Sequence, residues 1–377
     1  MGDGTKIQWT EASWNPVRGC SRVSAGCQHC YAETQAARFS GPGQPYEGLI
    51  QITSGGPRWN GAVKFVEEHL ADPLRWKRPR RIFVNSMSDL FHEALTFEQI
   101  AAIFGVMAAA RQHTFQVLTK RPARAREWFA WVASRPFEGP PAIPDGPWDP
   151  MAVALGYARK ADVELPRAPR TAAWPLPNVW LGVSVEDQKS AHERIPLLLG
   201  TPAAVRWVSY EPALGPVDFA RLAPPGFPHD TFDALRGVYR GGLEAPRLDW
   251  IVVGGESGPG ARPFDVAWAR STVAACKAAG VPCFVKQVGA YVVDRNDAGF
   301  EADTHVWVEG PDTGLPVDAG AWPTPVDVEH DLDGTVDGYQ GAPVRVRLKD
   351  RKGGDPSEWP TSLRVREFPS TPSRRTS

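Results

Sequence analysis

The sequence predicts one α/β fold, a modified or partial parallel (β/α) barrel, on the basis of two observations. Short apolar runs of β type alternate with amphipathic helical patterns, which is typical of βα units around a parallel sheet. Polar or charged residues follow most of these runs, as they do at the open end of a parallel barrel. The chain has 377 residues and 42% hydrophobic content, which is ample for one large core.

The alternation predicts strands and helices in a definite order. The strands are expected near residues 14–17, 82–85, 115–118, 179–183, 205–209, 250–253 and 283–286. The helices are expected at residues 97–111, 124–134, 188–199 and 266–279. Thr96 and Gln99 have the spacing of a capping box, which marks the start of the first of these helices.

Two stretches interrupt the alternation, at residues 136–177 and 215–247. We interpret both as insertions in one barrel rather than as separate domains. The barrel is then expected to occupy residues 1–290, with the C-terminal extension, residues 291–377, closing or covering it.

Charge and hydropathy exclude some classes of protein. The formal net charge of −1 gives no overall field that would attract nucleic acid, so any such contact has to come from a local patch. The sequence has no apolar run of about eighteen residues and no basic start followed by an apolar run. We therefore expect neither a membrane span nor a secretory signal. The expected location is the cytoplasm.

Three of the five cysteines gather in the pattern C-x6-C-x2-C, at Cys20, Cys27 and Cys30. Three thiolates without an evident fourth ligand suit a [4Fe–4S] cluster whose fourth iron stays open to a small molecule. A closed zinc site needs one more ligand, and His29 has little room to turn inward between two cysteines. Zinc, a disulfide and bare structural thiols remain alternatives. The remaining two cysteines, Cys276 and Cys283, are predicted to be small buried hydrophobes.

Polar groups follow six of the predicted strands. Because parallel strands end at one face of a barrel, we expect these groups to form one pocket around the cysteine loop. The alternative is that they are ordinary polar turns and helix caps. The candidates are Asn85, Ser86, Ser88, Asp89, Lys120, Ser184, Glu186, Glu211, Gly254, Gly255 and Glu256.

Two of these candidates have side chains suited to chemistry. Lys120 and Arg121 are expected to bind a carboxylate or phosphate at the open face, the alternative being solvated loop charges. Glu211 is expected to hold a ribose hydroxyl or to act as an acid or base, the alternative being a cap or structural salt bridge. The glycine-rich residues 254–260 suit either an anion near the backbone or a tight turn.

Residues 75–81 contain five basic residues in seven. They precede the second predicted strand, so we expect them on the face of the barrel opposite the cysteines. A solvated basic rim is the favoured interpretation, and docking of nucleic acid or another partner is the alternative.

The cysteine loop, its approach Trp14-Asn-Pro-Val-Arg-Gly-Cys20, residues 85–91, residues 118–122 and the tail 349–359 together resemble a known family. The chain is similar to the phage-associated three-cysteine-motif proteins of unknown function, which are similar to radical S-adenosylmethionine (SAM) enzymes. The resemblance implies a TIM-barrel-like, partial βα barrel with a cysteine loop after its first strand.

The resemblance also implies that Cys20, Cys27 and Cys30 each ligate one iron of a [4Fe–4S] cluster. SAM would chelate the fourth iron, and a reductant such as flavodoxin or ferredoxin would supply electrons. The common spacing in radical SAM enzymes is C-x3-C-x2-C, so this loop is longer by three residues. The Gly-Gly-Glu triplet that holds the SAM amino group usually follows the second strand, whereas residues 254–256 follow a late one.

An alternative site for the SAM amino group therefore follows the second strand, at Asn85, Ser86, Ser88 and Asp89. Ser184 and Glu186 are further candidates for cofactor binding. These features predict a radical SAM-like enzyme of unknown substrate, with a nucleic acid, nucleotide or modified base as the first hypothesis. Two alternatives are a metal-stapled, non-catalytic binding protein and a hydrolase or nuclease using Asp89, Glu186 and Glu211 with a divalent metal.

Overall fold

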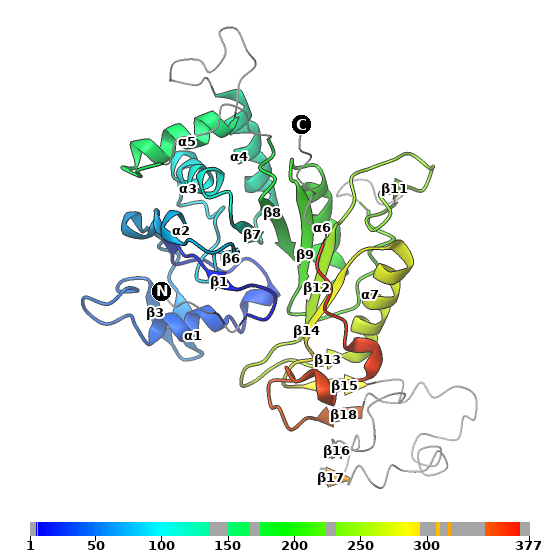
Figure 1. The fold of residues 1–377 in the computed structure, drawn as a ribbon. Helices are drawn as coiled ribbons and strands as arrows, with labels where there is room; N and C mark the ends of the chain where they lie inside the picture. Colours follow the sequence, from blue (N-terminus) through cyan, green and yellow to red (C-terminus); the bar gives the residue numbers. More distant parts are fainter. Residues whose placement is uncertain are drawn as a thin grey trace.

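The computed structural model describes residues 5, 7–135, 150–165, 174–223, 231–294, 307–309, 316–317 and 344–369. Its centre is a seven-stranded parallel sheet whose strands lie side by side in sequence order, curled into a half-barrel (Figure 1). The strands are β1 (Ala12–Ser13), β6 (Arg81–Val84), β7 (Thr114–Thr119), β8 (Val179–Ser184), β9 (Val205–Tyr210), β12 (Trp250–Gly254) and β14 (Cys283–Gln287). This arrangement is the one expected for a partial parallel barrel.

Helices follow four of the strands and cover the convex face of the sheet. They are α3 (Phe97–Ala109), α4 (Pro122–Ser134), α6 (Gln188–Leu199) and α7 (Val266–Ala279). The predicted capping box is confirmed, since Gln99 N donates to Thr96 Oγ1 at 3.2 Å and Thr96 N donates to Gln99 Oε1 at 3.0 Å. A further helix, α5 (Pro150–Lys160), packs on α3.

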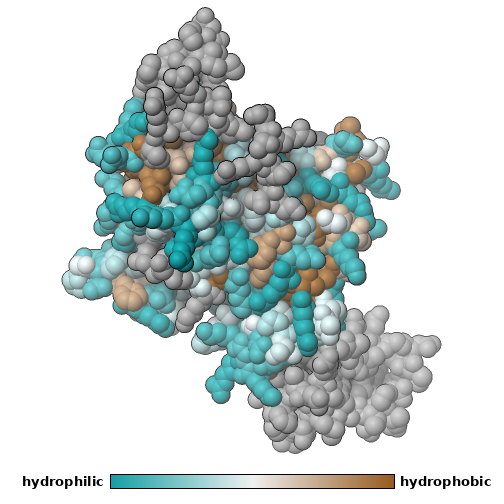
Figure 2. All heavy atoms as spheres, in the orientation of Figure 1, coloured by the Kyte–Doolittle hydropathy of each residue, from teal (hydrophilic) through white to brown (hydrophobic). Residues whose placement is uncertain are grey.

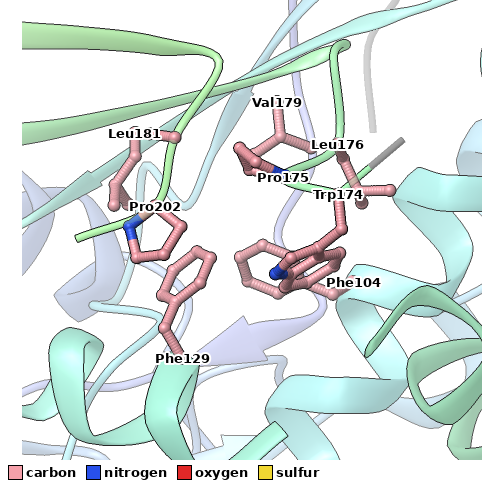
Figure 3. A pocket seen from close by; sticks show the side chains of 9 residues that line it. Phe104, Phe129, Trp174, Pro175, Leu176, Val179, Leu181 and Pro202 are labelled. Carbon is pink, nitrogen blue, oxygen red and sulfur yellow. The ribbon is translucent and has the colours of Figure 1, made fainter. Parts of the chain in front are cut away.

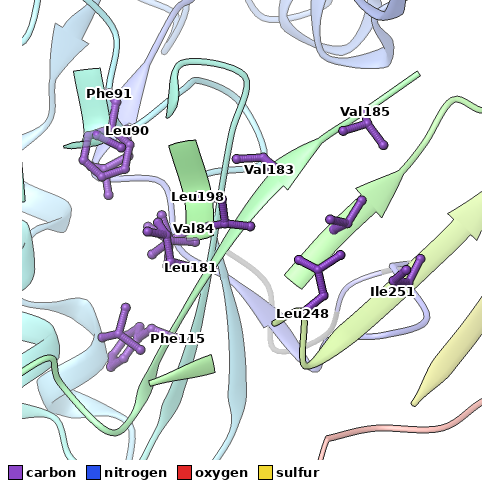
Figure 4. Packing of buried hydrophobic residues seen from close by; sticks show 14 of the residues in the cluster. Val84, Leu90, Phe91, Phe115, Leu181, Val183, Val185, Leu198, Leu248 and Ile251 are labelled. Atoms are coloured by element: carbon purple, nitrogen blue, oxygen red, sulfur yellow. The ribbon is translucent and has the colours of Figure 1, made fainter. Parts of the chain in front are cut away.

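The two faces of the sheet are buried by different partners. Because successive side chains of a strand point to opposite faces, alternate residues meet the helices. Figure 4 shows this layer between sheet and helices, with Val84, Phe115, Leu181, Val183 and Ile251 among its residues. Every residue of β8 is buried, as expected for a strand covered on both sides.

The concave face is filled by aromatic rings. Trp207 lies 5.2 Å from Trp9 and 5.3 Å from Trp250, measured between ring centroids. Phe83, Trp180 and Phe284 belong to the same buried cluster, to which residues from β6, β8, β9, β12 and β14 contribute. The interior of the half-barrel is therefore a packed core, and this use explains several of the fifteen tryptophans.

The first predicted strand was wrong in its position. β1 ends at Ser13, and Val17 and Arg18 form β2 (Val17–Arg18), which pairs with β5 (Lys64–Phe65) outside the main sheet. Pro16 has no N–H with which to continue the ladder. The other six predicted strands are confirmed to within one residue at each end.

The connection between β1 and β6 is a small lobe that the alternation did not predict. It contains η1 (Ala25–Cys27), α1 (Tyr31–Ala37), the hairpin of β3 (Ile50–Thr53) and β4 (Gly56–Trp59), η2 (Glu67–His69) and α2 (Asp72–Arg75). A separate apolar cluster holds it together, with Ala36 and Trp59 buried and Cys20 and Cys30 packed against them.

The predicted insertions are described only in part. Residues 136–149, 166–173 and 224–230 lie outside the described residues. Within the second insertion the structure has a hairpin of β10 (Phe232–Asp233) and β11 (Val238–Tyr239). None of the helices in the described ranges is long and apolar enough to cross a membrane. Hydrophilic residues, drawn in teal, cover much of the face shown in Figure 2.

The end of the chain runs along the edge strand β14. Val285 N donates to Val365 O, and Glu367 N donates to Cys283 O, both at 2.9 Å. Before that, β13 (Phe264–Asp265), β15 (Val292–Asp294), β18 (Val344–Arg347), β16 (Trp307–Glu309) and β17 (Pro316–Val317) form a second sheet. Two short turns, η3 (Pro356–Glu358) and η4 (Thr361–Leu363), lead back to the barrel, where Phe368 packs on the aromatic cluster.

A small recess lies between α3, α4 and the start of β8 (Figure 3). Its lining is apolar, with Phe104, Phe129, Trp174 and Leu181 among the residues. The space suffices for about one water molecule and offers no polar partner, so we interpret it as a packing gap.

The aromatic core leaves no space for a side chain at Gly182. A Cβ placed there would lie 2.5 Å from Trp207 Nε1 and 2.6 Å from its Cδ2. We predict that Gly182→Ala lowers the free energy of unfolding by about 1–3 kcal/mol through overpacking, measured by denaturant titration. Gly156→Ala, where nothing lies within 4 Å, is the control and should raise it by about 0.5–1 kcal/mol. If the two variants changed the free energy of unfolding equally, the Trp207 ring would have to move aside to admit the new methyl group.

Candidate functional site

The cysteine loop lies across the carboxyl ends of the parallel strands. Its residues and the first residue of α1 contact groups that follow four strands. In strand order the contacts are Tyr31 Oη to Ser86 O at 2.7 Å, Ser21 Oγ to Arg121 Nη2 at 2.7 Å, Ser24 Oγ to Glu186 Oε1 at 2.7 Å, and His29 Nδ1 to Glu256 Oε2 at 3.0 Å. Residues far apart in the sequence therefore meet at this end of the sheet.

The three thiols of the loop are free and partly buried. Burial, the charge of Asp89 and the charges of the Cys30 and Cys27 thiolates raise the pKa of Cys20 to about 12. Burial also raises the pKa of Cys30, with a contribution from the Cys27 thiolate. Because the neutral forms of Cys20 and Cys30 are favoured, a bound cation would be needed to hold these two as thiolates.

The donor set of the loop fits a group with three cysteine ligands and an open position. Within the described residues, no three His, Cys, Asp or Glu side chains are arranged around the position of a single metal ion. His29 is turned toward Glu256. In a cluster each cysteine binds a different iron, which is a wider arrangement than four ligands around one zinc.

Asp89 joins three elements at the end of β6. It accepts hydrogen bonds from Thr119 Oγ1 at 2.7 Å, Lys120 N at 3.0 Å and Arg121 Nη1 at 3.2 Å. Its side chain is buried, and Arg121 reaches on to Cys20, with Nη1 3.9 Å from Sγ. Asp89 therefore positions the start of α4 and the guanidinium beside the first cysteine.

Glu186 is the most enclosed of the predicted acidic residues, with its side chain 2% exposed. Lys120 Nζ lies 3.3 Å from Oε1 and Arg194 Nη1 lies 3.0 Å from Oε2. Burial by itself raises the pKa of Glu186, but Lys120, Arg194 and the hydrogen bond from Ser24 outweigh it and lower the pKa. A Cβ on Gly26 would come within 2.7 Å of Glu186 Cγ, so the cysteine loop packs directly on this carboxylate.

Glu211, which follows the neighbouring strand β9, forms a further ion pair. Lys286 Nζ lies 2.9 Å from Oε1, and Ser209 Oγ donates to Oε2 at 3.3 Å. A Cβ at Gly254 would lie 2.7 Å from Glu211 Oε1 and 3.2 Å from Gln287 O, so the backbone passes close to this carboxylate.

Glu256 is held beside the cysteine loop by Arg262. Arg262 N donates to Oε2 at 2.9 Å, and the guanidinium pairs with the same carboxylate. Burial by itself raises the pKa of Glu256, but Arg262 and the hydrogen bond from His29 outweigh burial, so the pKa is lowered. A Cβ on Gly255 would collide with Val288 O at 2.8 Å, so close packing explains this glycine without a bound anion.

The residues that follow β6 have mixed surroundings. Ser86 N and Met87 N both donate to Asn15 Oδ1, at 2.8 and 3.1 Å, and Ser88 Oγ donates to Val17 O at 3.0 Å. Asn85 differs from these residues. Its side chain is buried, and neither its Oδ1 nor its Nδ2 has a hydrogen-bond partner within the described residues. An unpaired buried carboxamide is unusual and suits a ligand contact.

Strand alternation places several candidates above the aromatic core. Leu118, Val252 and Phe284 belong to the inner cluster, so residues two positions later face the same way. Those residues are Lys120, Gly254 and Lys286. By the same argument Ser184, two residues after Gly182, lies on the inner face, and it is buried. The inner face thus changes from aromatic to charged at the carboxyl ends of the strands.

Several residues that build the site were not predicted from the sequence. They are Asn15, Arg22, Ser24, Glu33, Arg194 and Arg262. A signal existed for Arg194, because it shares the apolar face of α6 with Ala191, Ile195 and Leu198. A cation on a buried helical face predicts a buried anion nearby.

The carboxylates suggested for a divalent metal are paired with separate cations. The pairs are Asp89 with Arg121, Glu186 with Lys120 and Arg194, and Glu211 with Lys286. Their geometry gives no support to one shared ion between the three.

The basic residues 75–81 lie at the amino end of β6, as expected from the sequence, and so opposite the cysteine loop. Arg81 stacks on Phe368 at 4.0 Å and lies 3.5 Å from Glu11. Arg75 pairs with Asp72 at 3.4 Å. Cys276 and Cys283 are buried as predicted.

The chain belongs to a protein family described as "protein of unknown function (DUF5131)", whose match extends over residues 4–350. No curated protein and no solved structure gives a match. Family membership thus supports the resemblance to a family of unknown function, and it carries no activity with it.

Glu186 should contribute to stability in a pH-dependent way. Its pKa is lower in the folded state, so its contribution is complete above its usual pKa of 4.5 and is lost as the pH falls through the folded value. We predict that Glu186→Gln lowers the free energy of unfolding by about 3 kcal/mol at pH 7, because Lys120 and Arg194 lose their buried partner.

Denaturant unfolding between pH 3 and pH 7 tests this expectation. The difference between wild type and Glu186→Gln should shrink at the acid end of the range. Glu68→Gln, at an exposed position, is the control and should change little. A constant difference at every pH would contradict an ionised Glu186 in the fold.

Proposed function

We propose that this chain is an iron–sulfur enzyme of the radical SAM type. One observation supports the proposal most strongly. A loop with three free thiols lies over the carboxyl ends of a partial parallel barrel, where four strands end in polar groups. Active sites of parallel barrels are built at this face.

Cys20, Cys27 and Cys30 would hold three irons of a [4Fe–4S] cluster, leaving the fourth iron for SAM. When bound and reduced, such a cluster supplies the electron that cleaves SAM to methionine and a 5′-deoxyadenosyl radical. A flavodoxin or ferredoxin would be the source of that electron.

The residues around the loop suit the binding of a charged small molecule. Lys120 would pair with a carboxylate of the small molecule. Its present partner Glu186 would still be paired with Arg194. The unpaired carboxamide of Asn85 offers both a donor and an acceptor. Glu211, on the inner face beside Lys286, would hold a ribose hydroxyl or move a proton.

The substrate we propose is a nucleic acid, a nucleotide or a modified base. The charged inner face supports a polar, charged substrate, and residues 75–81 at the opposite end of β6 would give a nucleic acid a remote contact. A metal-stapled binding protein and a divalent-metal hydrolase are the alternatives that the following experiments distinguish.

The metal content is the first test. Anaerobically reconstituted protein should bind about four irons per chain and absorb broadly in the visible range. Serine at Cys20, Cys27 or Cys30 should abolish this, whereas alanine at Cys276 or Cys283 should not. Reduced wild type should form 5′-deoxyadenosine above the level of Cys27→Ala, and a nucleic acid or nucleotide should accelerate it. One tightly bound zinc with no cluster would contradict the proposal.

The role of Lys120 gives a second test. We predict that Lys120→Ala weakens SAM binding by about 1.5–3 kcal/mol, the value of a hydrogen bond to a charged group, while iron content stays at the wild-type level. Lys64→Ala, at an exposed position of β5, is the control. Calorimetric titration of SAM into reconstituted protein measures the difference. Unchanged affinity would assign Lys120 to the Glu186 ion pair alone.

A further inference from the structure

The guanidinium of Arg121 lies directly behind the cysteine loop. Its side chain is only 5% exposed, and all three nitrogens donate hydrogen bonds. Nε donates to Glu93, Nη2 donates to Ser21 Oγ at 2.7 Å, and Nη1 donates to Asp89 at 3.2 Å. The same Nη1 lies 3.9 Å from Cys20 Sγ, within hydrogen-bond distance for sulfur.

We propose that Arg121 sets the charge at the Cys20 sulfur and thereby the reduction potential of the group that the cysteine loop holds. This inference rests on the proposed iron–sulfur function. Reduction potentials of iron–sulfur clusters depend on net charge, on hydrogen bonds to the sulfurs and on exposure. A buried cation that donates to one ligand sulfur favours the reduced, more negative state.

The position of Arg121 is fixed from two sides. Thr119 and Lys120 N hold Asp89, and Asp89 holds Nη1. Ser21 accepts Nη2 through both its hydroxyl and its carbonyl oxygen, at 2.7 and 3.2 Å. The guanidinium therefore cannot swing away from Cys20 without breaking contacts to both the loop and the sheet.

The two carboxylates on Arg121 are not equivalent. Asp89 is buried, whereas the side chain of Glu93 is 62% exposed, on the solvent side of the guanidinium. Removing the charge of Glu93 leaves Arg121 in place and makes its neighbourhood more positive. Removing the charge of Arg121 makes it more negative. The two substitutions should thus change the reduction potential in opposite directions.

The experiment measures the midpoint potential of the reconstituted protein by spectroscopic redox titration. Arg121→Gln should lower the potential by about 59 mV, which is a tenfold change in a one-electron reduction equilibrium. Glu93→Gln should raise it by a smaller amount, because water screens an exposed charge. Arg124→Gln is the control, since Arg124 donates to Leu95 O at 2.7 Å without contacting the cysteine loop.

Iron content and thermal unfolding are measured for each variant. Opposite shifts at full iron content support the inference, and a purely structural role of Arg121 would not produce them. If Arg121→Gln does not fold, the sign of the Glu93→Gln shift decides. Unchanged potentials, or shifts of the same sign, overturn the inference and leave the proposed function standing. Wild type without a cluster overturns the proposed function, and this inference with it.

Discussion

The candidate site depends on the buried ion pair between Asp89 and Arg121, 3.2 Å apart. Asp89 ends the turn after β6, and Arg121 precedes α4 after β7, so the pair joins two neighbouring strand ends. Through Ser21 and Cys20, Arg121 also fixes the cysteine loop. Burying two charges is costly unless both are paired and hydrogen bonded, and here every polar atom of the guanidinium has a partner.

The same principle repeats around the sheet. Glu186 balances Lys120 and Arg194, Glu211 balances Lys286, and Glu256 balances Arg262. Each pair lies at the carboxyl end of a strand, above an inner core made of aromatic rings. The arrangement separates an apolar interior of the half-barrel from a charged layer at the carboxyl ends of the strands.

The tertiary structure also changes how single motifs are interpreted. Gly254 and Gly255 look like an anion-binding turn in the sequence, yet neighbouring atoms already occupy the space where their side chains would lie. His29 resembles a metal ligand by its position between two cysteines, but it contacts Glu256. Tryptophans also suit ligand stacking, but eight of them are buried, four of these in the interior of the half-barrel.

Sequence alone determined the order of six strands of the main sheet and of the four helices that follow its strands, because hydrophobic periodicity and caps are local. α6 and α7 match their expected bounds, with Asp187 and Asp265 as N-caps and Gly280 ending α7 in the left-handed conformation. The gathering of polar groups at one face was predictable, because parallel strands end there. Only tertiary structure decided the partners, since Arg194, Arg262 and Ser24 reach their carboxylates through contacts between segments far apart in the chain. The hydrophobic pattern of an element predicts which of its faces is buried. It does not predict which charged residue from another part of the chain pairs with a charge on that face.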